Sequence, residues 1–126
     1  MKKIINKLTM LIIPVSDMPR AKEFYADKLG LEVTKDYRQN DQAWWVSLTP
    51  GDGITITLTT YNDGRVKRGA MTLYFLTSDV AGAHKELESN GVKVNDIKDD
   101  LYGPGSGVKW FNIEDPDGNM VFLSEK

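Results

Sequence analysis

Residues 14–33, PVSDMPRAKEFYADKLGLEV, decide the fold, because they carry a helix together with both of its boundaries. The apolar run at 8–15 reads as a buried strand that leads into them. Ser16 and Asp17 form a good N-cap pair, and Gly30 stands where a left-handed C-terminal cap is expected. The stretch therefore predicts a strand followed by a helix. The helix has an apolar stripe formed by Met18, Ala21, Phe24, Tyr25 and Leu29.

The same signals return in the second half of the chain. Three matches follow one another in order: Ser16-Asp17 with Ser78-Asp79 at an offset of 62, Gly30 with Gly91 at 61, and Asp52-Gly53 with Asp117-Gly118 at 65. The drop from 62 to 61 implies that the second helix is one residue shorter than the first. Ordered matches at a nearly constant offset indicate an internal duplication.

Each half reads as one strand, one helix and three further strands. The strands are expected at about 8–15, 32–37, 43–49 and 54–60, and again at 71–77, 92–98, 108–114 and 120–124. The predicted fold class is α+β, with two tandem βαβββ modules in a single domain of residues 1–126. Module one covers about 1–66 and module two about 67–126.

Composition limits the chemistry before any motif is considered. The chain has 126 residues, 40% of them hydrophobic, with one histidine and no cysteine, which excludes disulfides, thiolate nucleophiles and iron–sulfur clusters. The 16 basic and 18 acidic residues provide no basic footprint for nucleic acid. No apolar run approaches the roughly 18 residues of a membrane span. Asn6 and Lys7 interrupt the apolar N-terminal stretch, so we expect no secretory signal and a cytoplasmic protein.

The segments 14–33 and 111–125, the latter FNIEDPDGNMVFLSE, resemble the vicinal oxygen chelate superfamily. That superfamily includes glyoxalase I, the extradiol dioxygenases, and the bleomycin and fosfomycin resistance proteins. The resemblance implies two sheets side by side as a cupped mixed sheet, helices on its outer face, and a ligand or metal site in the cup. Both segments are first of all structural, since Asp115–Asn119 reads as a hairpin turn and Phe24 and Tyr25 as core.

The resemblance also locates the metal ligands of metal-dependent members, which are usually His or Glu and sometimes Gln. The four corresponding residues here are Met10, Thr57, Thr72 and Phe122. A thioether, two hydroxyls and a phenyl ring are poor donors for a divalent cation, so we expect no metal and no other cofactor. His84 is expected on the second helix, away from the cup. The acidic residues of the second half are interpreted as solvated surface: Asp96, Asp99, Asp100, Glu114, Asp115 and Asp117.

Strand alternation predicts what faces the cup. In 54–59 the isoleucines and the leucine must face the helices, which turns the threonines inward. The predicted lining is uncharged and aromatic, and it consists of Met10, Trp45, Thr55, Thr57, Thr72, Tyr74, Trp110 and Phe122. The glycine-rich loop at 103–107 is interpreted as a connection or a lid, and not as a phosphate cradle, because a strand follows it.

Two functions of different class stay open. The first is a metal-independent protein of the glyoxalase/bleomycin resistance type, which sequesters a planar apolar or aromatic compound by stacking and has no catalytic residue. The second is a divergent enzyme, either a glyoxalase-like lyase or isomerase or an extradiol-type dioxygenase. Acid–base catalysis by Tyr74 or threonine hydroxyls is a weaker third reading, because no general base accompanies them. The resemblance further implies a homodimer, and the charge balance and short apolar runs predict no nucleic-acid or membrane partner.

Overall fold

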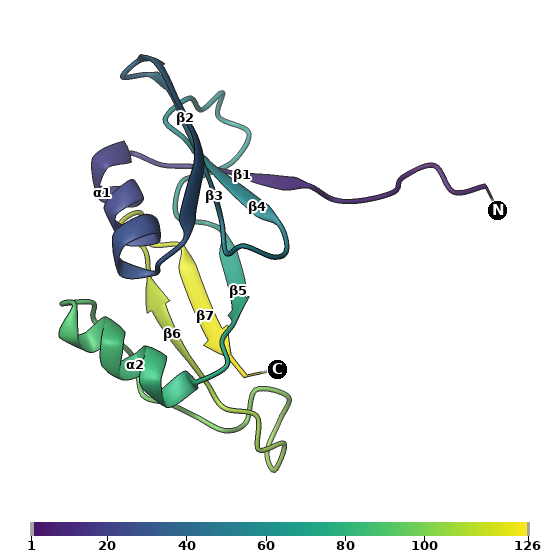
Figure 1. The fold of residues 1–126 in the computed structure, drawn as a ribbon, viewed down its shortest axis with the longest axis vertical. Helices are drawn as coiled ribbons and strands as arrows, with labels where there is room; N and C mark the ends of the chain where they lie inside the picture. Colours follow the sequence, from purple (N-terminus) through teal and green to yellow (C-terminus); the bar gives the residue numbers. More distant parts are fainter. Residues whose placement is uncertain (1, 126) are drawn as a thin grey trace. The chain divides into compact units, whose positions relative to one another are not determined.

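The computed structural model describes residues 2–125 of the chain, which divide into two units between Asp63 and Gly64. The elements of the first unit are β1 (Met10–Pro14), α1 (Met18–Lys22), the π-helix η1 (Glu23–Lys28), β2 (Glu32–Asn40), β3 (Ala43–Thr49) and β4 (Thr55–Thr59). Those of the second unit are β5 (Thr72–Leu76), α2 (Val80–Ser89), β6 (Trp110–Glu114) and β7 (Met120–Ser124). Figure 1 shows these elements along the chain.

Each unit contains one mixed sheet. The first sheet has the strand order β1-β4-β3-β2 and the second has the order β5-β7-β6. In both sheets the first strand of the unit runs parallel to the last one, and the remaining pairs are antiparallel. This confirms the α+β class and the two βαβββ-type modules.

The duplication extends to the pairing register. Met10 pairs with Thr55 in the first sheet, and Thr72 pairs with Met120 in the second, as the offsets of 62 and 65 require. Similarly, the pair of Trp45 with Thr59 corresponds to the pair of Trp110 with Ser124. Because a slip of one residue would turn every side chain to the other face, equal registers place repeat-related residues on equivalent faces.

The helices begin as the sequence predicts. The Asp17 carboxylate accepts a hydrogen bond from the Arg20 amide at 3.1 Å, and the Asp79 carboxylate accepts one from the Gly82 amide at 2.9 Å. Each of these bonds satisfies an amide that has no partner within its helix.

The first helix differs from the second in its last turns, which are π-helical. The Leu29 amide donates to the Phe24 carbonyl, five residues back, at 2.9 Å. A π-turn accommodates one extra residue in a helix, which explains why the first helix segment is one residue longer than the second. Phe24 and Tyr25 lie in this segment, and both are buried, as predicted.

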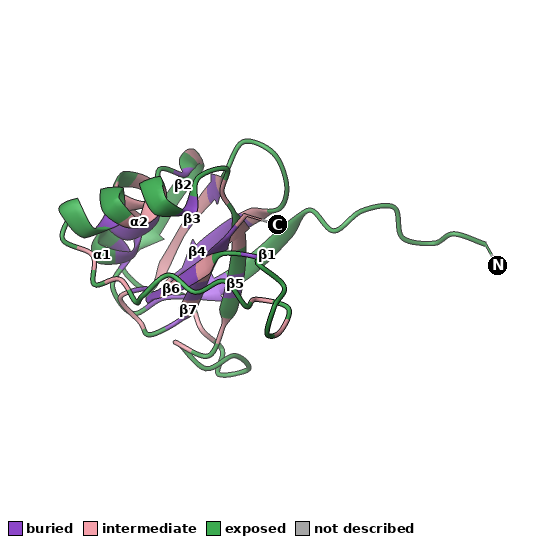
Figure 2. Cartoon of the chain, turned by 90° about the horizontal axis from the view of Figure 1, so that it is seen from below, coloured by how far each residue is buried: buried purple, intermediate pink, exposed green. Residues whose placement is uncertain are grey.

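The core of each unit lies between its helix and one face of its sheet. α1 contacts β4 and α2 contacts β6. Figure 2 shows buried segments among the strands and exposed outer turns on the helices. The predicted helix-facing residues of the third strands are fully or almost fully buried, and they are Val46, Leu48, Phe111 and Ile113.

One predicted strand is wrong. Residues 92–98 form no strand of their own, so the second sheet has three strands where the first has four. Two backbone amides of this segment still donate to β6, Asn95 to Asn112 at 3.2 Å and Lys98 to Trp110 at 2.8 Å. Asn95 and Asp96 favour turns over regular pairing, which interrupts the ladder.

Element boundaries also differ from the prediction. β1 begins at Met10 and not at residue 8, because its neighbour β4 begins only at Thr55. β6 likewise begins at Trp110, and β2 continues to Asn40. Among the helices described, none is long and apolar enough to cross a membrane.

Candidate functional site

The four predicted site residues of the first unit share one face of its sheet. Met10 pairs with Thr55, and Trp45 pairs with Thr59, two positions beyond Thr57 on the same strand. Paired residues point to the same side of a sheet, and so do residues two apart on a strand. This is the face opposite the buried row that contains Leu58.

Hydrogen bonds occupy the centre of this face. The Thr57 hydroxyl donates to Met10 Sδ at 2.8 Å, and the Ser47 and Thr57 hydroxyl oxygens lie 2.8 Å apart. Thr57, a member of the predicted lining, is consequently buried. Ser47 is absent from the predicted set, but alternation from Trp45 along the same strand identifies it.

An aromatic pair lies on the same face, on the strands β2 and β3 at one edge of the sheet. The rings of Tyr37 and Trp45 stack with their centroids 5.8 Å apart and an interplanar angle of 25°. The two residues are register partners on β2 and β3. Tyr37 is 55% exposed and Trp45 is half-buried, so the pair is accessible mainly through Tyr37. The prediction omitted Tyr37, which cross-strand pairing alone reveals.

The second unit carries the other four predicted residues, again on one face. Thr72 and Tyr74 lie on β5, Phe122 lies on β7 opposite Tyr74, and Trp110 lies on β6. The Tyr74 and Phe122 rings stack with centroids 4.5 Å apart at 12°. The centroid of the Trp110 ring lies 5.3 Å from that of Phe122, and the two ring planes form an angle of 32°. Three rings thus form a row across three strands.

The ends of this row differ in accessibility. Phe122 has a ring on each side. The Trp110 indole donates to the Asp100 carboxylate at 3.0 Å, and the Lys98 ammonium lies 5.6 Å from its ring centroid. Tyr74 is 64% exposed. The accessible stacking surface of this row is therefore the Tyr74 ring, with Phe122 and Trp110 as its support.

The family resemblance implies metal ligands at four positions, and the residues that stand there do not fit a divalent cation. Two of them, Met10 and Thr57, are hydrogen-bonded to each other, and Phe122 has no donor atom and packs between two rings. Thioether sulfur and neutral hydroxyl groups are weak ligands for the metals that imidazole and carboxylate hold. No cluster of three or more His, Asp or Glu side chains suited to a metal occurs within residues 2–125.

His84 lies on the helix side of its unit. Its Nε2 is 2.9 Å from the Asn95 carbonyl oxygen, and its ring meets the buried Phe111 ring edge-on at 5.0 Å. Since a carbonyl only accepts, the Nε2 atom is the donor. His84 therefore holds residues 92–98 near α2, and it does not belong to the aromatic face.

One carboxylate is wrongly predicted as solvated surface. Asp115 is only 5% exposed, because it organises the DPDGN turn. Its carboxylate accepts hydrogen bonds from the Asp117 amide at 3.0 Å, the Asn119 amide at 2.8 Å and the Asn119 side-chain amide at 2.7 Å. Asn119 Oδ1 in turn accepts from the Met71 amide at 2.8 Å. Through Asn119, these hydrogen bonds connect the turn to Met71, which directly precedes β5.

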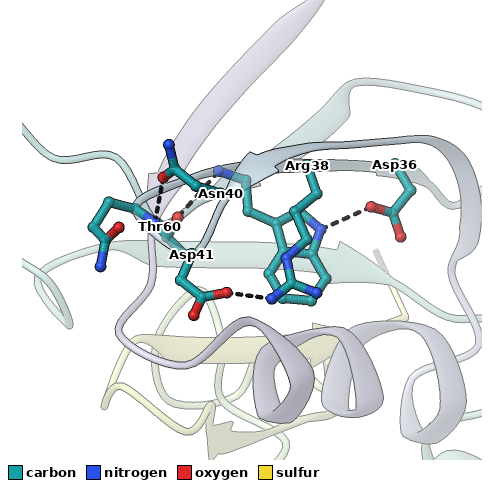
Figure 3. Close-up of polar contacts among 7 residues, drawn as sticks. Asp36, Arg38, Asn40, Asp41 and Thr60 are labelled. Carbon is teal, nitrogen blue, oxygen red and sulfur yellow. Dashed lines mark hydrogen bonds and ion pairs between the residues drawn. The ribbon is translucent and has the colours of Figure 1, made fainter.

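A second polar network lies on the helix side of β2 and β3 (Figure 3). The Trp44 indole donates to Asp36 at 2.8 Å, and the Lys22 ammonium donates to the same carboxylate at 2.7 Å. The Lys22 hydrogen bond first, and then that of Trp44, hold the pKa of the Asp36 carboxyl below its ordinary value. The Arg38 guanidinium lies 4.3 Å above the Trp44 ring and is paired with Asp41. These groups satisfy one another, which assigns them a structural role.

The fold and the paired faces define a protein built from two βαβββ-type modules with an aromatic, donor-poor face in each. Residues 5–123 match the model of the Glyoxalase/Bleomycin resistance protein/Dioxygenase superfamily, and the chain belongs to this family.

Three relatives illustrate the breadth of the family. TnmS3, an antibiotic binding protein from Streptomyces sp. CB03234, is 25% identical, with 98% of each chain covered and a TM-score of 0.78. A superfamily member from Sphaerobacter thermophilus DSM 20745 is 29% identical, with 97% of this chain and 98% of that chain covered and a TM-score of 0.78. YetH of Bacillus subtilis (strain 168) is 23% identical over 97% of this chain and all of that protein.

Proposed function

We propose that the protein binds a planar apolar or aromatic small molecule by stacking, without a metal and without chemical conversion of the ligand. The carrying observation is the exposed ring of Tyr74, which Phe122 and Trp110 support from behind in a continuous row. The Tyr74 ring stacks on Phe122, which itself packs against Trp110, so the ring presents a supported surface and little conformational entropy is lost when a ligand covers it.

The surroundings of Tyr74 favour an uncharged ligand. Thr72 and Leu76 flank it on β5, and Leu76 is 72% exposed. This face offers apolar contact and a few hydroxyl groups near the ring, and a phosphonate or diphosphate would need convergent Arg or Lys side chains. An aromatic stack contributes about 0.5–1.5 kcal/mol beyond the burial of area, and the remaining affinity must come from apolar contact.

A relative and the side chains at the four expected ligand positions support the same function. TnmS3 is described as an antibiotic binding protein, which is a binding function on this fold. The donor-poor residues at the four ligand positions favour metal-independent binding over the lyase, isomerase and dioxygenase alternatives. We also propose that the protein is cytoplasmic, because Asn6 and Lys7 interrupt its apolar N-terminal stretch. From the family resemblance, we propose that its partner is a second copy of the chain.

A matched pair of probes tests the proposal. 2-Naphthol is planar and aromatic, and decahydro-2-naphthol has the same skeleton and hydroxyl group without the π-system. In EDTA, we expect 2-naphthol to raise the melting temperature and quench tryptophan fluorescence, while its saturated counterpart does so much less. Equal effects of the two compounds would contradict stacking, and no effect of either would contradict this class of ligand.

A further inference from the structure

The stacking of Tyr74 on Phe122 determines the direction in which a ligand extends. The two residues are register partners on β5 and β7, so one strand spacing of about 4.8 Å separates their backbones. Their ring centroids are 4.5 Å apart and their planes differ by 12°. Because this stack runs across the strands, the planes of both rings run along them. A flat ligand that stacks on Tyr74 lies in a parallel plane and therefore extends along β5.

Two side chains of opposite character lie along β5 on the same face as Tyr74. Thr72 precedes it by two residues and Leu76 follows it by two, and residues two apart on a strand share a face. All three side chains are exposed. A ligand on the Tyr74 ring therefore meets a hydroxyl group in one direction and an aliphatic group in the other.

The same contrast continues across the sheet. Thr72 is aligned with Glu114 of β6, because both are in register with one residue of β7, and the Glu114 side chain is exposed. Leu76 is aligned in the same way with Trp110. The face is therefore polar at the end of Thr72 and more apolar at the end of Leu76. An amphipathic ligand has one preferred orientation on such a face.

Thr72 offers the polar group nearest along the strand to the Tyr74 ring. Two residues of a strand span about 6.7 Å, whereas Glu114 lies two strands away. The Asn112 side chain is already engaged within the protein, where its Oδ1 accepts at 2.7 Å and its Nδ2 donates at 3.0 Å. In the described part of the chain, residues 2–125, no group is hydrogen-bonded to the Thr72 hydroxyl. This hydroxyl is consequently available to a ligand.

We propose that Thr72 determines specificity by hydrogen-bonding a hydroxyl group on the edge of the stacked ligand, which makes the ligand a hydroxyl-bearing planar arene. Because this assignment depends on the proposed function, it deepens that function and names its ligand class. A fused two-ring arene reaches Thr72: one ring stacks on Tyr74, the other carries the oxygen along β5, and a hydrogen bond of about 2.8 Å spans the remaining distance. An analogue without the hydroxyl binds less well, since it covers the Thr72 hydroxyl and leaves it unpaired.

Equilibrium dialysis in EDTA with 2-naphthol and 2-methylnaphthalene tests this assignment, because the second compound carries a methyl group in place of the hydroxyl. Thr72→Val removes the protein hydroxyl and nearly keeps the shape of the side chain. We expect Thr72→Val to bind 2-naphthol about two- to tenfold more weakly than wild type, the effect of one hydrogen bond. Its affinity for 2-methylnaphthalene should be unchanged or higher.

Two further variants serve as controls. Thr72→Ser keeps the hydroxyl and should retain the affinity of wild type for 2-naphthol. Thr34→Val makes the same exchange at an exposed position of β2 in the first unit and should bind both compounds as wild type does. Valine is a good strand former, so near-ultraviolet circular dichroism should be unchanged in both valine variants.

Three outcomes overturn the role of Thr72. Equal weakening of both compounds by Thr72→Val would indicate packing without a hydrogen bond. Unchanged binding of both would mean that the ligand hydroxyl lies elsewhere, and a loss in Thr72→Ser as large as in Thr72→Val would assign the effect to the threonine methyl group.

Tyr74→Ala distinguishes a failure of this assignment from a failure of the proposed function. It removes the stacking ring, so it should weaken the binding of both compounds. If it does so while Thr72→Val changes neither affinity, only the role of Thr72 is wrong. If Tyr74→Ala changes neither affinity, or wild type binds neither compound, the stacking function is wrong and the role of Thr72 is wrong with it.

Discussion

The Thr57 hydroxyl donates a hydrogen bond to the sulfur of Met10 at 2.8 Å, and the family resemblance implies metal ligands at these two positions in metal-dependent members. The side chains converge as ligands would, but a thioether and a hydroxyl meet there in place of imidazole and carboxylate groups. At the repeat-related positions, Thr72 stands beside a strand whose Phe122 packs between two rings. The four positions thus carry side chains that are poor ligands for a divalent cation.

We predict that the protein does not bind Ni²⁺ or Mn²⁺ at a stoichiometric site. After dialysis against EDTA, calorimetric titration with either metal should give no saturable heat, because the donors at the four positions are weak. Met10→His/Thr57→Glu is the matched positive control, since its two new ligands replace side chains that already touch. Saturation of the wild-type protein at one equivalent of metal would overturn this prediction.

Asp115→Ala should destabilise the second unit strongly. The substitution removes a buried carboxylate that accepts three hydrogen bonds and leaves the Asn119 amides without that acceptor. We expect a loss of about 2–4 kcal/mol in the free energy of unfolding, measured by urea denaturation. Asp96→Ala, at an exposed acidic position, should stay within about 0.5 kcal/mol of wild type. If Asp115→Ala lowered the free energy of unfolding as little as the control does, the Asp115 hydrogen bonds would not stabilise the unit.

Gly69→Ala should also destabilise the protein, for two separable reasons. Gly69 has a φ of +80°, and an added Cβ would lie 2.3 Å from the Asp117 carbonyl oxygen. Gly64 has a φ of +88° with nothing within 4 Å of an added Cβ, so Gly64→Ala reports backbone strain alone. Strain costs about 1–2 kcal/mol in each variant, and the collision adds to it at residue 69. Equal unfolding free energies for the two variants would mean that Gly69 does not pack closely on the turn.

The Asp36 network predicts a small stability change at acidic pH. The folded-state pKa of Asp36 is lowered, so the carboxylate stabilises the fold at pH values above the unfolded pKa of about 4. This contribution is lost as pH falls through the folded-state pKa. Because Lys22 and Asp36 are both more than one-third exposed, the effect should be at most about 1 kcal/mol.

Urea unfolding of wild type and Asp36→Asn at two pH values checks this sign. Wild type should be the more stable protein at pH 7, and the difference should shrink towards pH 3. A difference that is constant between the two pH values would show that the carboxylate charge does not stabilise the network.

Much of the fold follows from the sequence because the residues that begin the helices and set the register act through local patterns. The Asp17 and Asp79 caps, the apolar stripes and the offsets of 62 and 65 predict the helices and equal registers in both sheets. Alternation then places all eight predicted site residues on the faces opposite the helices, four in each unit. Whether those residues hold a ligand stays a prediction.

The remaining features depend on contacts that no local pattern encodes. The first helix accommodates its one extra residue as a π-turn before Leu29. Residues 92–98 pair with β6 only at isolated points. Burial of Asp115 arises from its hydrogen bonds with Asn119, which outweigh its preference for water. Cross-strand stacking places Phe122 between Tyr74 and Trp110 and leaves the Tyr74 ring exposed, which alternation along a single strand does not predict.

The most direct test of the central claim is the dissociation constant of 2-naphthol for EDTA-treated wild type and for Tyr74→Ala. Removal of the exposed ring should weaken binding about two- to tenfold, which corresponds to the contribution of one aromatic stack. Tyr102→Ala, which removes another exposed tyrosine ring, should bind as wild type does. Wild-type affinity in Tyr74→Ala, or binding that requires added metal, would contradict the account.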